Sequence, residues 1–218
     1  MGTVELDTGY VEELLRRQDA LQAEASHVIA QLDLMTLLGR AGRAEQVGSF
    51  VSGLMVWRDI DVGAVSPGLG VERAWDIMRP IIARPEITGV SYANESGHLN
   101  TSGRPYDDRH YFVIHFETAD RDDWKIDITF WLTDGPREQR ARALAMTRLP
   151  HETRIRILWL KDVWHRLPTY PYEVGGTDIY DAVLEHGVRT LDEFDAYLLK
   201  RGLPSRRAST ADVTVGRV

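Results

Sequence analysis

Two carboxylates stand one residue apart in an apolar stretch of the sequence that ends at Val62. They belong to Asp59 and Asp61, with Ile60 between them. In a β-strand both carboxylates project from one face, while Ile60 and Val62 enter the core on the other. Neighbouring carboxylates repel each other, and a bound Mg²⁺ ion, which prefers oxygen ligands, removes that repulsion. The spacing therefore predicts half of a metal site.

A glycine–serine pair, Gly48-Ser49, precedes these acids, with nine residues between Ser49 and Asp59. Glycine allows the backbone to approach a triphosphate closely, and the serine hydroxyl and amide can bind phosphate oxygens. We expect the pair to end a short strand at residues 44–49 and to form a phosphate-binding turn.

A third carboxylate, Asp127, lies in an expected strand at 124–132, in which apolar and polar residues alternate from Trp124 to Phe130. Ile126 and Ile128 share one strand face, so Asp127 projects from the other. If that face also carries the first two acids, the three could hold two Mg²⁺ ions ~3.5–4 Å apart, as in-line nucleotidyl displacement requires. Asp127 would then also be a candidate general base for the acceptor hydroxyl. The alternative is a solvent-facing residue, or one paired with Lys125.

Hydrophobic periodicity predicts an α+β fold: a small mixed sheet with an N-terminal helix, followed by a helical domain. We expect a catalytic domain at 1–134, with its helix at 9–38 and its motif core at 45–132, a helical acceptor-side domain at 135–204, and a mobile tail at 205–218. The expected strands are 44–49, 58–65, 86–95, 109–118 and 124–132, and the further helices are 50–57, 71–84, 137–148, 150–164, 178–186 and 190–200.

Composition restricts the class of protein. The 218 residues include no cysteine, which excludes disulfides and thiolate chemistry. A cytoplasmic protein is the natural expectation, since neither a secretory signal nor a membrane-spanning stretch is visible. The net charge of −7 disfavours nucleic acid as a partner and suits a small acceptor, which could be cationic.

The glycine–serine pair followed by the Asp-x-Asp strand resembles the signature of the nucleotidyltransferase superfamily, which has the DNA polymerase beta-like fold. The resemblance covers about 45–132. A third acid follows on a later strand in that family, and Asp127 matches it by context, although its distance from Asp61 exceeds that in the smallest members. The residues that the resemblance assigns are Gly48 and Ser49 for the nucleotide, and Asp59, Asp61 and Asp127 for metal and catalysis.

The resemblance implies Mg²⁺-dependent transfer of a nucleoside monophosphate (NMP) from a nucleoside triphosphate (NTP) to an acceptor, with release of pyrophosphate. Size, acidic charge and domain order are most like the bacterial enzymes that modify small molecules, including the aminoglycoside and lincosamide nucleotidyltransferases of antibiotic resistance. Two alternatives stay open: transfer to a protein or a tRNA, as in nucleotidyltransferase toxins, and a non-catalytic NTP-binding module.

Several other residues are weaker candidates for substrate contacts. His110 and His115 fall on opposite faces of one strand, so at most one can face a site. The polar loop at 96–109 and the aromatic loop at 170–172 could approach substrate. The basic residues that could meet phosphates, although a solvated helix face is the simpler interpretation, are Arg137, Arg140, Arg142 and Lys161.

Overall fold

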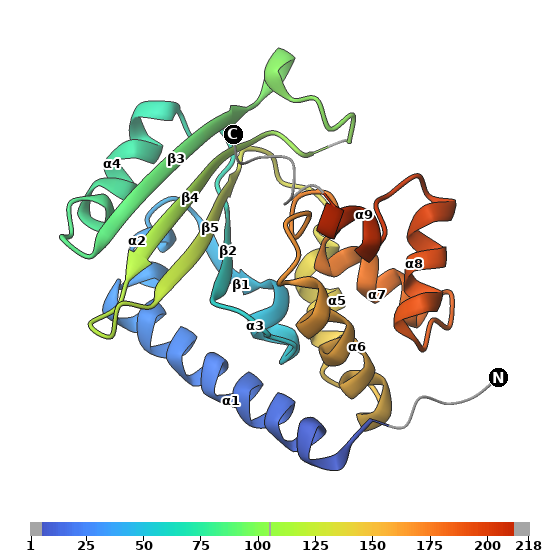
Figure 1. Ribbon diagram of the computed structural model, residues 1–218. Coiled ribbons are helices and arrows are strands. Elements are labelled where there is room, and N and C mark those ends of the chain that lie inside the picture. The colour runs from blue at the N-terminus through green and yellow to red at the C-terminus, as the bar shows by residue number, and fades with distance from the viewer. Residues whose placement is uncertain (1–5, 105, 212–218) are drawn as a thin grey trace, which may run out of the picture. The chain divides into compact units, whose positions relative to one another are not determined.

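The computed structural model describes residues 6–104 and 106–211 (Figure 1). The strands are β1 (Arg43–Val47), β2 (Asp59–Val65), β3 (Ile87–Glu95), β4 (Arg109–Glu117) and β5 (Asp123–Trp131). The helices are α1 (Thr8–Gln31), α2 (Leu34–Gly39), α3 (Gly48–Ser52), α4 (Val71–Ile82), α5 (Glu138–Met146), α6 (His151–Trp164), α7 (Gly176–Leu184), α8 (Leu191–Lys200) and α9 (Arg206–Ala211), with a 3-10 turn at Gly97–Leu99. The predicted α+β class is confirmed.

No helix in the described ranges is both long and apolar enough to cross a membrane.

The five strands form one mixed sheet in the order β1-β2-β5-β4-β3. β2 and β5 run parallel, and the other neighbouring pairs are antiparallel. The parallel pair lies near the centre of the sheet (Figure 1), so the residues that the two strands contribute face each other across one ladder. This pair carries all three acids that the sequence singled out.

Strand alternation divides the sheet into an apolar face and a polar face, as predicted. Ile60 and Val62 of β2, and Ile126 and Ile128 of β5, are almost fully buried. They pack in one core with apolar side chains of α1, α2 and α4. The alternate residues of β2 and β5 are therefore held on the opposite face, because a shift of one residue would expose the whole apolar set.

The chain divides into two compact units, Ala20–Arg148 and the segments Met1–Asp19 with Leu149–Val218. This division differs from the boundary that we expected at residue 134. Helix α5 belongs with the sheet because Arg140 donates a hydrogen bond of 2.8 Å to the Gln46 carbonyl at the end of β1.

Three local expectations were wrong. The long helix ends at Gln31 because Asp33 takes a left-handed backbone conformation (φ 51°), and α2 follows it. The first strand ends at Val47, and Gly48 begins α3 instead of completing the strand. Residues 206–211 form α9, where Arg206 pairs with Asp195 at 2.7 Å; the rest of the expected mobile tail, 212–218, lies outside the described residues.

The second unit has its own buried polar centre at Asp162 of α6. Its carboxylate pairs with Arg17 and Arg166, and it accepts a 2.8 Å hydrogen bond from the Tyr10 hydroxyl. The predicted capping box at the start of α8 is also present, because Thr190 accepts from the Glu193 amide and Glu193 accepts from the Thr190 amide. Both interactions fix helix ends or helix packing within this unit.

Candidate functional site

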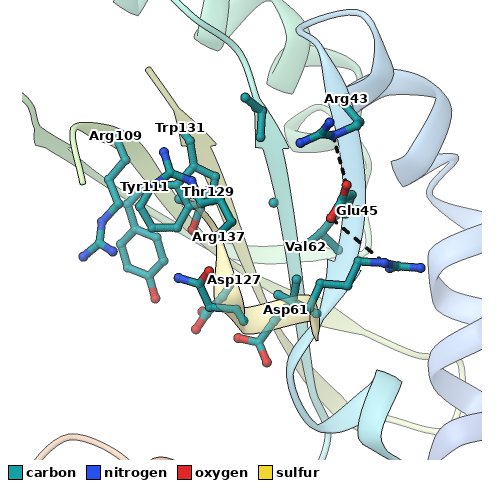
Figure 2. A pocket seen from close by; sticks show the side chains of 15 residues that line it. Arg43, Glu45, Asp61, Val62, Arg109, Tyr111, Asp127, Thr129, Trp131 and Arg137 are labelled. Carbon is teal, nitrogen blue, oxygen red and sulfur yellow. Dashed lines mark ion pairs between the residues drawn. The ribbon is translucent and has the colours of Figure 1, made fainter. Parts of the chain in front are cut away.

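The register of the parallel ladder places the predicted acids next to one another. Asp61 lies opposite Asp127, and Asp59 lies opposite Lys125. Figure 2 shows the carboxylates of Asp61 and Asp127 side by side and pointing the same way. Asp59 precedes Asp61 by two residues and so shares its face. The sequence-predicted triad is therefore assembled on the polar face of β2 and β5.

Lys125 lies among these carboxylates. Its ammonium Nζ is 2.6 Å from Asp127 Oδ2 and 3.3 Å from Asp59 Oδ1. The pairing of Asp127 with Lys125, which the sequence left as an alternative, is present together with the convergence of the three acids. Burial by itself lowers the pKa of Lys125, but the charges of Asp59 and Asp127 outweigh it and raise that pKa above its ordinary value. Lys125 is therefore a cation in the site.

Gly48 brings the backbone directly against Asp61. Its φ is +69°, a left-handed conformation, and a Cβ built on it would lie 2.0 Å from Asp61 Oδ2. Glycine is required here on both grounds, because it alone adopts this φ without strain and leaves room for the carboxylate. Ser49 follows in the first turn of α3 and is buried. The glycine–serine pair and the acid pair are thus one structural feature.

Tyr111 of β4 is a member of the site that the sequence reasoning did not single out. It lies opposite Thr129 in the antiparallel ladder, next to Asp127 and on the same face. Burial, and then the negative charge of Asp127, raises the pKa of the Tyr111 hydroxyl. The sequence pattern could have indicated this residue, because the alternation that buries Phe112 places Tyr111 on the polar face.

A cavity of about 340 Å³ extends from Asp61 and Asp127 over the polar face of β1, β2, β4 and β5 (Figure 2). This volume matches the lower range of small-molecule sites, which is ~300–1,000 Å³. Its charged and aromatic lining residues are Arg43, Glu45, Asp61, Arg109, Tyr111, Asp127, Trp131, Arg137 and Arg140.

Arginine side chains and aromatic rings form the end of the cavity away from the acids. The guanidinium of Arg137 lies 4.3 Å from the Trp131 ring centroid, and that of Arg109 lies 5.3 Å from the same centroid. Arg109 also pairs with Glu95 at 2.5 Å. Such stacking holds a guanidinium flat against the ring and orients its donors. Of the basic residues considered from sequence, Arg137 and Arg140 line this cavity.

The donor set fits a divalent ion that arrives with a triphosphate. No three Asp, Glu or His side chains in the ranges that the structure describes form a metal site by themselves. Mg²⁺, however, is usually held by only one or two carboxylates, with substrate phosphates completing its ligands. Asp127 Oδ1 is buried and has no hydrogen-bond partner among the described residues, so this oxygen has unused acceptor capacity.

Other candidates from the sequence have polar partners of their own. His110 is buried, with Nδ1 3.0 Å from the Tyr92 hydroxyl and Nε2 3.1 Å from the Leu69 carbonyl. His115 lies on the other face of β4 from His110, opposite Lys125 in the ladder, and its Nδ1 is 2.9 Å from Asp123 Oδ2. Lys161 is buried in α6 and donates to the Tyr180 hydroxyl at 3.1 Å. His110 and Lys161 are thus held by contacts in the interior, whereas His115 makes a contact at the surface.

Comparison with known proteins found solved structures but neither a matching family model nor a matching curated protein. One similar structure is a cytoplasmic RNA terminal U-transferase, with 16% identity and a TM-score of 0.43 over 74% of this chain. This chain spans 50% of the U-transferase chain. Another is E. coli MS115-1 CdnC with ATP, with 12% identity and a TM-score of 0.41; the match covers 91% of this chain and 69% of that one.

Proposed function

We propose that the protein transfers an NMP from an NTP to a hydroxyl of a small-molecule acceptor and releases pyrophosphate. One observation carries the proposal. Asp61 and Asp127 lie opposite each other on parallel strands, with Asp59 on the same face, and the left-handed Gly48 backbone lies against Asp61. This combination places oxygen ligands for a cation beside a backbone segment that a triphosphate can approach closely.

In this reaction the acceptor oxygen forms a bond to the α-phosphorus while the bond from that phosphorus to the bridging oxygen of pyrophosphate breaks. Gly48 and Ser49 would bind the triphosphate. Asp59, Asp61 and Asp127 would hold the divalent ion, which supplies charge stabilisation at the α-phosphate. The acceptor proton would pass to the Asp127 carboxylate as general base. Tyr111, kept protonated by its raised pKa, would donate a hydrogen bond near that carboxylate.

The cavity supports a small acceptor and refines its charge. Four arginines and three carboxylates line it; Arg43 pairs with Glu45 at 3.0 Å, Arg109 with Glu95 at 2.5 Å, and Asp127 with Lys125 at 2.6 Å. A polycation such as an aminoglycoside would meet guanidinium groups there. A neutral or anionic acceptor with a flat or apolar part, able to pack on Trp131, suits the lining better. We therefore expect an aminoglycoside to fit this cavity poorly.

The test follows labelled phosphorus. Each of the four NTPs, labelled at the α-phosphate, is incubated with the protein, Mg²⁺ and a bacterial lysate, and the label is separated into small-molecule, RNA and protein fractions. We expect label in the small-molecule fraction and none with Asp59→Asn. Label in RNA or protein would reassign the acceptor to a macromolecule. Unchanged transfer by Asp59→Asn would refute the proposed site.

A further inference from the structure

A buried lysine, Lys125, lies among the carboxylates of the triad. Lys125 Nζ lies between Asp59 and Asp127, at 3.3 and 2.6 Å from one oxygen of each. Its side chain is only 10% exposed. The chain has three lysines, Lys125, Lys161 and Lys200, and Lys125 forms ion pairs with Asp59 and Asp127.

The net charge of the site favours a lysine that stays among the carboxylates when an ion binds. Three carboxylates contribute a formal charge of −3, and the ammonium removes one unit of it, which leaves −2 for a single divalent ion to neutralise. A second divalent ion between Asp59 and Asp127 would lie next to the buried ammonium. Two like charges at such a distance repel strongly where solvent is largely excluded.

Lys125 is also held in place by its surroundings. The ladder fixes its backbone opposite Asp59, and its ammonium lies 5.8 Å from the Trp57 ring centroid. Moving the side chain into solvent would break two ion pairs and a cation–π contact, and it would leave the partly exposed carboxylates of Asp59 and Asp127 without the cation between them. These contacts favour a lysine that stays in the site over one that leaves when substrate binds.

We propose that the Lys125 ammonium takes the place of the ion that would bridge Asp59 and Asp127, so that NMP transfer here runs with one divalent ion instead of two. The inference rests on the proposed function, and it replaces our sequence-based expectation of two Mg²⁺ ions. The single ion would be bound on the Asp61 side, next to Gly48. Lys125 would supply fixed positive charge on the Asp127 side, where the acceptor hydroxyl enters.

The first experiment needs no nucleotide. Mn²⁺ binding to the wild type and to Lys125→Met is measured by electron paramagnetic resonance, because free and bound Mn²⁺ differ in signal. Lys125→Met removes the cation that competes with the ion for these carboxylates, so we expect at least tenfold tighter binding in this variant. Lys125→Arg keeps the charge and should bind as weakly as the wild type. Lys200→Met, on the surface of α8, is the matched control and should also leave binding unchanged.

The thermal stability of the same proteins gives a second readout. Lys125→Met should melt below the wild type without metal, and Mn²⁺ should raise its melting temperature more than that of the wild type, because binding to the folded state alone stabilises it. Equal Mn²⁺ affinity and equal stabilisation in the two proteins would overturn the inference.

The third measurement counts ions in the complex with an NTP analogue that carries a methylene group between the α- and β-phosphates. We expect one Mn²⁺ ion per wild-type chain and two per Lys125→Met chain. Two ions in the wild type would overturn the inference, even if the variant does not fold. Binding of none of the four analogues to any variant would instead contradict the proposed function, and the nucleotide-free comparison would still decide the role of Lys125.

Discussion

Replacement of Gly48 by alanine tests whether the glycine turn positions Asp61. The added Cβ would lie 2.0 Å from Asp61 Oδ2 and 2.8 Å from its Cγ. Ordinary van der Waals contact begins near 3.4 Å, so the carboxylate oxygen must move by about 1.4 Å. A misplacement of ~1 Å in a catalytic constellation can cost ~100-fold in rate, so we expect Gly48→Ala to lose at least ~100-fold in NMP transfer.

The left-handed backbone of Gly48 adds a separate cost to stability. Alanine in this conformation costs ~1–2 kcal/mol, which should lower the free energy of unfolding by that amount. Gly68 is a matched control, because its φ is +73° and a Cβ there meets nothing within 4 Å. Gly68→Ala should therefore lose similar stability and keep its activity.

The assay combines urea unfolding with the rate of pyrophosphate release for both alanine variants. Comparison at equal folded fraction removes the shared cost of the backbone conformation. A rate for Gly48→Ala within threefold of that for Gly68→Ala would show that the close approach of Gly48 to Asp61 is not needed for activity. It would refute the idea that the glycine turn positions the Asp61 carboxylate.

Three further predictions concern single side chains. Asp59→Asn should abolish NMP transfer while the free energy of unfolding changes by less than ~1 kcal/mol, measured in urea, because the residue is partly exposed. Burial, followed by the hydrogen bond to Asp162, raises the pKa of Tyr10 from 10.0 to about 12. The protonated hydroxyl therefore stabilises the folded state fully below pH 10, and this contribution to the free energy of unfolding is lost as the pH rises through 12. Tyr10→Phe should therefore show a smaller loss of stability than the wild type over this range, whereas Tyr172→Phe, at an 85% exposed position, should behave as the wild type. Asp162→Ala leaves Arg17 and Arg166 without their shared carboxylate and should cost ~1–3 kcal/mol in urea unfolding, with Mn²⁺ affinity unchanged.

Alternation in the strands made much of the site predictable from the sequence. Ile60 and Val62 are apolar enough to fix which face of β2 is buried, and Ile126 and Ile128 do the same for β5. Once those faces are fixed, Asp59, Asp61 and Asp127 must lie on the other side. The strand neighbours and the register are set by long-range pairing, so the position of Asp61 opposite Asp127 needed the structure.

Local backbone geometry was harder to predict from residue types. Gly48 was expected to close a strand, but its left-handed φ starts a helix and directs the chain past Asp61. The expected helix 9–38 is interrupted at Asp33, because a single left-handed residue is enough to end the helix there. The arginine and tryptophan lining of the cavity depends on how the segment after β5 folds back, which no short-range pattern specifies.

The most direct test of the central claim is a calorimetric titration with the four methylene-bridged NTP analogues in the presence of Mg²⁺. We expect the wild type to bind at least one analogue, with affinity that depends on Mg²⁺, and Asp61→Asn to bind it at least tenfold more weakly. Failure of the wild type to bind any analogue, or equal binding by Asp61→Asn, would contradict the account.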